Sequence, residues 1–130
     1  MSSSLSRSDH AILIFMIRII RNPITLAELK QEAEEVFGDM VKAVVDVEKQ
    51  ILAINGELHA DEEQVLLEKG SKQADLWGIN LYPSLYGTVD WLEYDSMINL
   101  RPSGGNKSRG VENPLVQKKI REIIENLVID

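Results

Sequence analysis

The chain has 130 residues, of which 44% are hydrophobic and 27% charged, a composition typical of a single soluble globular domain. It contains no cysteine, which excludes disulfides, thiolate metal sites and cysteine nucleophiles. The formal net charge of −7 disfavours nucleic acid and anionic membranes as partners unless a local basic patch provides the contact. Cysteine usage leaves the compartment open, and we take the cytoplasm as the default.

The first notable segment is the apolar run Ala11–Ile20. It is too short to span a bilayer, which takes about 20 apolar residues. Arg18 and Arg21 stand where a signal peptide would have its cleavage site, so we predict a buried strand over residues 12–20 instead. Residues 1–15, serine-rich at the start, are expected to form a disordered or optional extension to a single domain at 16–130.

A helix is predicted next, with both of its ends marked in the sequence. Thr25 and Glu28 have the spacing of a capping box. Apolar residues then recur at helical spacing as far as Phe37, and Gly38 provides the usual left-handed stop.

The middle of the chain predicts a hairpin followed by a short helix. Residues 40–48 alternate apolar and polar side chains, although Val44 breaks the alternation, and residues 51–58 form the second strand. Asp61, with Gln64 three residues later, is the expected cap of a helix over 62–68.

The last part of the chain predicts two more strands and the longest helix. The strands span residues 76–82 and 91–100, and the first places Asn80 and Tyr82 on one face. Asn113 and Pro114 mark the beginning of the last helix.

This order of elements predicts an α+β fold with a mixed, mainly antiparallel sheet of about five strands, two main helices and one short helix. A right-handed crossover through the first helix would make the first two long strands parallel. If both main helices cover the same face, the other face is left for a partner or a ligand. Together with the exposed edges of the sheet, this predicts a homo-oligomer.

The glycine-rich stretch 101–113 is the first candidate site. Glycines allow backbone N–H groups to converge, and three basic residues add charge, as in loops that hold phosphate or carboxylate groups. The stretch matches no phosphate-binding signature. The alternative is a solvated connection whose arginines pair with the chain's own carboxylates. The predicted ligand-binding residues are Asn99, Arg101, Asn106, Ser108 and Arg109.

A second candidate is acidic. Glu57, His59 and Asp61 offer oxygen and imidazole ligands that suit a divalent cation such as magnesium or manganese, and Glu57 and His59 share a side if the strand continues through them. No motif spacing supports a metal, and Asp61 is already explained as a helix cap. His59 or Glu57 could instead transfer a proton, but no nucleophile motif accompanies them.

A resemblance to a known family rests on five blocks of the sequence, NPITLAELK, VKAVVDVE, GELHADEE, GSKQADLWGINLYP and YDSMINLRPSGGNKSRGVENP. Through these blocks the chain resembles, from Ile17 to Ile129, a small prokaryotic family known only as a domain of unknown function. The resemblance implies a domain that begins near Met16, and it implies no activity, cofactor or catalytic residue.

We therefore expect a binding or assembly domain whose loop accepts a small anionic ligand. The alternative is an enzyme that acts on a phosphorylated or nucleotide-like substrate, with or without a divalent metal. An enzyme requires His59 and Glu57 to share one concave pocket with the loop. A binding domain places the loop on open surface or in a subunit interface. No particular cofactor is indicated by the sequence.

Overall fold

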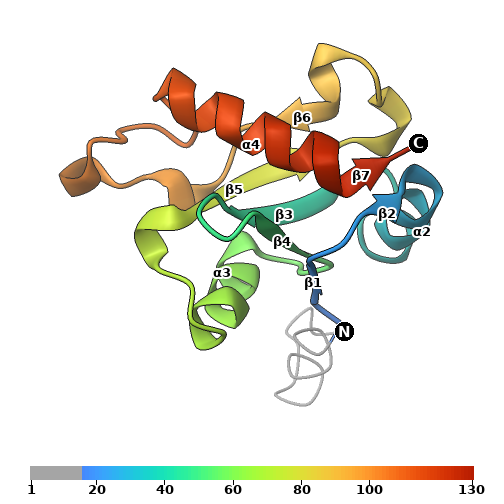
Figure 1. Cartoon of the computed structure of the whole chain (residues 1–130), viewed down its shortest axis with the longest axis horizontal. Coiled ribbons are helices and arrows are strands. Elements are labelled where there is room, and N and C mark those ends of the chain that lie inside the picture. The colour runs from blue at the N-terminus through green and yellow to red at the C-terminus, as the bar shows by residue number, and fades with distance from the viewer. Residues whose placement is uncertain (1–15) are drawn as a thin grey trace, which may run out of the picture.

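The computed structural model describes residues 16–130, so the predicted extension at 1–15 and the start of the predicted first strand lie outside the described residues. Within this range the chain forms an α+β domain, as predicted (Figure 1). The helices and strands are β1 (Arg18–Ile20), β2 (Ile24–Thr25), α2 (Leu26–Val36), β3 (Val41–Asp46), β4 (Ile51–Ile54), α3 (His59–Glu68), β5 (Leu76–Leu81), β6 (Leu92–Glu93), α4 (Pro114–Leu127) and β7 (Val128–Ile129).

Five strands form one sheet in the order β1-β4-β3-β5-β6, and every neighbouring pair is antiparallel. Strands β2 and β7 form a separate parallel pair. The predicted parallel relation of β1 and β3 is correct in direction, because both run antiparallel to β4. The two strands are not neighbours, however, because β4 lies between them. All four residues of β4 are buried, as expected of a strand with a neighbour on each side.

Helices cover both faces of this sheet. The first face packs against α2 and α4, and the second against α3 and the short turn Met97–Asn99 (Figure 1). The expectation that one face is left open for a partner is therefore wrong. Val44, which breaks the alternation in β3, belongs to the core of the second face together with Leu66 of α3. No helix within residues 16–130 is both long and apolar enough to cross a membrane.

The ends of α2 and α4 are as predicted. The hydroxyl oxygen of Thr25 accepts a hydrogen bond from the Glu28 N–H at 3.1 Å, which is the contact of a capping box. Gly38 has a φ of +89°, and its N–H donates to Ala33 at the end of α2. Asn113 caps α4 by accepting from the Leu115 N–H at 2.9 Å.

The start of α3 differs from the prediction. The helix begins at His59 after Leu58, so Asp61 lies inside its first turn and is not its cap. Strand β4 ends at Ile54 because Asn55 takes a φ of +74° and turns the chain away from the sheet. Glu57 consequently lies on an exposed bend and not on a strand beside His59.

The predicted strand 91–100 is mostly absent. Only Leu92 and Glu93 pair with β5, and Met97–Asn99 forms a single turn of 3₁₀ helix capped by the Ser96 hydroxyl. Ser96, Ile98 and Asn99 of this stretch contact Gly78 of β5 instead of forming a strand.

Candidate functional site: a braced loop and the polar cluster beside it

Along β5, the buried side chain of Asn99 forms the backbone hydrogen bonds that a neighbouring strand would otherwise form. Its Oδ1 accepts from the Gly78 N–H at 2.8 Å, and its Nδ2 donates to the Gly78 carbonyl at 2.9 Å. Nδ2 also donates to the carbonyl of Arg109 at 2.9 Å, which ties the far side of the loop to the same point. A Cβ on Gly78 would lie 2.4 Å from the Cβ of Ser96, so this close approach requires glycine.

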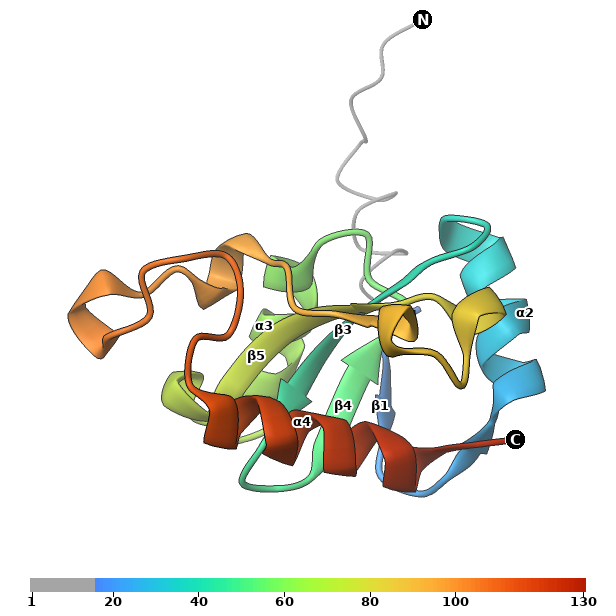
Figure 2. The same cartoon turned by 90° about the horizontal axis from the view of Figure 1, so that it is seen from above.

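Asn106, also buried, holds the tip of the loop. Its Nδ2 lies 2.7–3.0 Å from the carbonyl oxygens of Asn99, Ser108 and Gly110, and its Oδ1 accepts from the Glu112 N–H at 2.9 Å. Residues 96–112 therefore form a preformed structure, which we call the braced loop. It projects at the end of the molecule opposite α2 (Figure 2).

Arg101 points inward and joins the braced loop to β5. Its guanidinium donates to the carbonyls of Ile98, at 3.1 Å, and Leu76, and lies 4.7 Å from the centre of the Trp77 ring. Burial lowers the pKa of Arg101, and the nearby Glu63 carboxylate opposes this effect. The guanidinium thus has partners within the domain.

The outer side of the braced loop carries exposed donors that already meet carboxylates. Arg109 Nε lies 2.7 Å from Asp95 Oδ1, with side chains 54% and 42% exposed. The Lys107 N–H donates to Glu112 Oε2 at 2.9 Å. Arg109 thus shows the contact of the alternative prediction, in which the arginines of the loop pair with the chain's own carboxylates. Of the predicted ligand-binding residues, Asn99, Arg101 and Asn106 are thus turned inward, and Ser108 and Arg109 lie on the exposed side.

His59 lies elsewhere, at the start of α3. The residue is only 9% exposed, and its Nε2 lies 2.8 Å from the carbonyl oxygen of Ile79. Burial lowers the pKa of His59, Lys42 acts in the same direction, and the hydrogen bond to Ile79 opposes both. Within residues 16–130 no three His, Asp or Glu side chains are placed to bind a metal ion together, so Glu57, His59 and Asp61 form no such group.

A row of polar side chains crosses the sheet next to His59. The sequence alone indicates only part of this row. Lys42, Asn80 and Glu93 stand opposite one another on β3, β5 and β6. Glu93 Oε1 accepts from Asn80 Nδ2 at 2.8 Å and from the Tyr82 hydroxyl at 2.9 Å. Alternation along residues 76–82 indicated Asn80 and Tyr82, whereas Lys42 and Glu93 depend on strand pairing that the sequence does not reveal.

This row leads to the braced loop. Asn80 Nδ2 lies 3.3 Å from the backbone carbonyl of Asp95, whose carboxylate pairs with Arg109, and the charge of Asp95 also acts on His59. Asp95 therefore pairs with the exposed end of the predicted anion site and acts electrostatically on the predicted proton-transfer residue, His59. Burial, followed by the Glu93 carboxylate, raises the pKa of Tyr82.

Comparison with known proteins identifies the family of this chain. A family model described as "Protein of unknown function (DUF5674)" matches residues 18–127. The chain belongs to this family. The matched range agrees with the expected resemblance over 17–129, and the DUF5674 description assigns no activity. No curated protein and no solved structure matches the chain.

Proposed function

We propose that this DUF5674 domain is a binding module whose braced loop accepts an anionic group of its ligand at Lys107, Ser108 and Arg109. The observation that carries the proposal is that internal carboxylates already occupy this surface: Asp95 on Arg109 and Glu112 on the Lys107 N–H. Donors that hold a carboxylate at 2.7–2.9 Å have the geometry that an external carboxylate or phosphate needs.

The internal contacts are of a kind that an external anion can replace. Both partners of the Arg109–Asp95 pair are exposed, and such pairs contribute only about 0–1 kcal/mol because water and salt screen them. The loop, in contrast, is fixed by the buried amides of Asn99 and Asn106. A ligand therefore meets an ordered surface and loses little free energy to the ordering of the loop.

The test is thermal unfolding at increasing concentrations of inorganic phosphate and of sulfate. A bound anion stabilises the folded state by mass action, so the midpoint should rise with concentration. Arg109→Ala should remove the specific part of this rise. Lys118→Ala, an exposed change on α4, is the matched control. Sulfate also stabilises proteins through exclusion from their surface, so all variants are compared in the same salt. Identical responses of the three proteins would refute the anion site.

The second candidate is an enzyme that acts on a phosphorylated or nucleotide-like substrate. One observation favours it, namely that Asp95, which pairs with Arg109, also acts electrostatically on His59. Arg109 would hold the phosphate, and His59 would transfer a proton. Hydrolysis of p-nitrophenyl phosphate that His59→Gln abolishes, with the fold intact by circular dichroism, would favour the enzyme over the binding module.

A further inference from the structure

Glu62 is a fully buried carboxyl group on the first turn of α3. Its Oε2 accepts from the Gly56 N–H at 3.0 Å, and its Oε1 has no hydrogen-bond partner. Burial raises the pKa of Glu62 well above its usual range, while the Gly56 N–H and the charge of Lys42 lower it by less. The uncharged carboxyl group is therefore the form that fits this position.

The turn at residues 55–56 lies directly against this carboxyl group. A Cβ on Gly56 would come within 2.6 Å of the Glu62 Cγ, so the contact leaves no space for any other residue. Asn55 precedes it with a φ of +74°, a conformation that asparagine tolerates better than most residues. The hydrogen bond from Gly56 to Glu62 thus holds a turn that departs from the geometry of β4.

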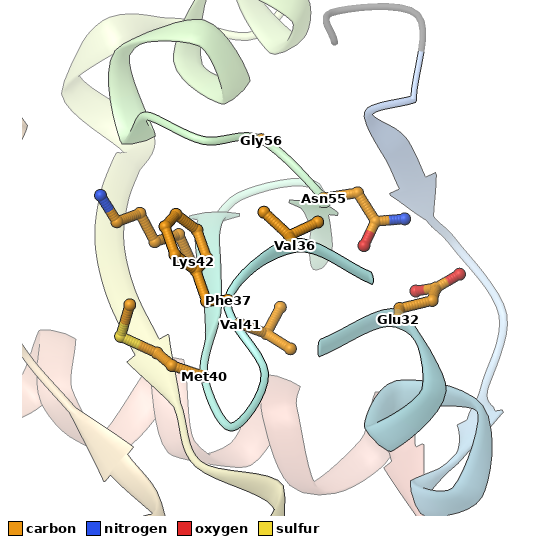
Figure 3. Close-up of a pocket in the computed structure, with 8 residues that line it drawn as sticks. All are labelled: Glu32, Val36, Phe37, Met40, Val41, Lys42, Asn55 and Gly56. Atoms are coloured by element: carbon orange, nitrogen blue, oxygen red, sulfur yellow. The ribbon is translucent and has the colours of Figure 1, made fainter. Parts of the chain in front are cut away.

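The same turn forms one wall of a hollow, shown in Figure 3. Val36 at the end of α2, the following Phe37 and Val41 of β3 also line it. The hollow is too narrow to admit a water molecule. Asn55 at its edge has a buried Oδ1 without a hydrogen-bond partner.

We propose that the contact between Glu62 and Gly56 is a latch that keeps this hollow closed, and that ionisation of Glu62 releases the turn 55–56 and opens the hollow. Lys42 of β3 and Asp61 of α3 are the charged groups that act on Glu62. Strand β4 and the turn Met97–Asn99, which also pack against α3, contain no ionisable side chain.

An ionised Glu62 would keep a single N–H donor and no cation in hydrogen-bond contact, which is costly in a buried site. Movement of the carboxylate to water relieves that cost and breaks its bond to Gly56. Because the folded-state pKa of Glu62 is raised, the closed latch is favoured at low pH and loses stability as the pH rises through that pKa. His59, bonded to Ile79, keeps the start of α3 on the sheet.

The experiment measures hydrogen exchange at the Gly56 amide from pH 5 to 9, expressed as a protection factor that corrects for the intrinsic rate. In the wild type, protection should fall about tenfold per pH unit above the ordinary carboxyl range, because opening is coupled to the loss of one proton, and should level off above the raised pKa of Glu62. Glu62→Gln keeps an acceptor for the Gly56 N–H and cannot ionise, so its profile should be flat. Glu68→Gln, exposed at the end of the same helix, should behave like the wild type.

Matching profiles for the wild type and Glu62→Gln would overturn the latch. If Glu62→Gln does not fold, carbon-13 titration of the Glu62 carboxyl in the wild type decides the question. A raised pKa at which the fall in Gly56 protection comes to an end supports the latch, and protection that does not change with pH below that pKa overturns it.

Discussion

At the scale of single residues, the braced loop is held to β5 by the polar atoms of Asn99 and Arg101. The chemistry expected of Asn99 and Arg101 was ligand contact, whereas their polar atoms bond to Gly78, Leu76 and Ile98 of the same domain. These partners are 3 to 25 positions away in the sequence, and most become neighbours only after the chain folds.

The first prediction at this scale concerns Asn99. Asn99→Ala would leave the Gly78 N–H and carbonyl, both in a buried position, without these partners. Each unsatisfied group costs about 1–3 kcal/mol, so we expect a loss of roughly 2–5 kcal/mol in the free energy of unfolding. Urea denaturation measures it. Asn126→Ala, exposed on α4, should change stability by less than about 0.5 kcal/mol. Equal midpoints for the two variants would show that Asn99 does not brace the loop.

At the scale of elements, prediction succeeded where the signal is local. The ends of α2 and α4 follow from residues within one turn, such as Thr25 and Asn113, and these caps form. The predicted start of α3 is wrong because Asp61 has the sequence signature of a cap, whereas the helix begins at His59, three residues before the predicted start, without a side-chain cap. Its position depends instead on His59 and Glu62, whose bonds to Ile79 and Gly56 are tertiary contacts.

The second prediction tests the capping box of α2. Thr25→Ala removes the hydroxyl that accepts from the Glu28 N–H, and the expected loss is about 1 kcal/mol in the free energy of unfolding. Thr25→Ser keeps the acceptor and should retain most of the stability. Denaturant midpoints of the two variants and the wild type measure the difference. If alanine and serine give the same midpoint, the hydroxyl is not what stabilises the start of α2.

At the scale of the whole molecule, one of the two reasons for expecting an oligomer, an open face of the sheet, no longer holds. The second face of the sheet is covered by α3, so it provides no open surface for a partner. What remains are the two edges of the sheet, β1 and β6, and among the strands of residues 16–130 β1 pairs with β4 alone. Ile17 and Ile19 along this edge are only partly buried. An edge strand of this kind can pair with its copy across a two-fold axis and extend the sheet.

The last prediction follows from this edge. If the protein forms a homo-oligomer through β1, light scattering should give at least twice the chain mass of 14.7 kDa at high concentration. Because the chain has no cysteine, Ile19→Cys introduces a single thiol at the edge, and mild oxidation should then yield a covalent dimer. Ser103→Cys on the exposed loop is the control and should cross-link far more slowly. A chain that begins at Met16 should associate equally well, because β1 is retained. A monomeric mass at every concentration, with equal cross-linking of both variants, would contradict assembly through β1.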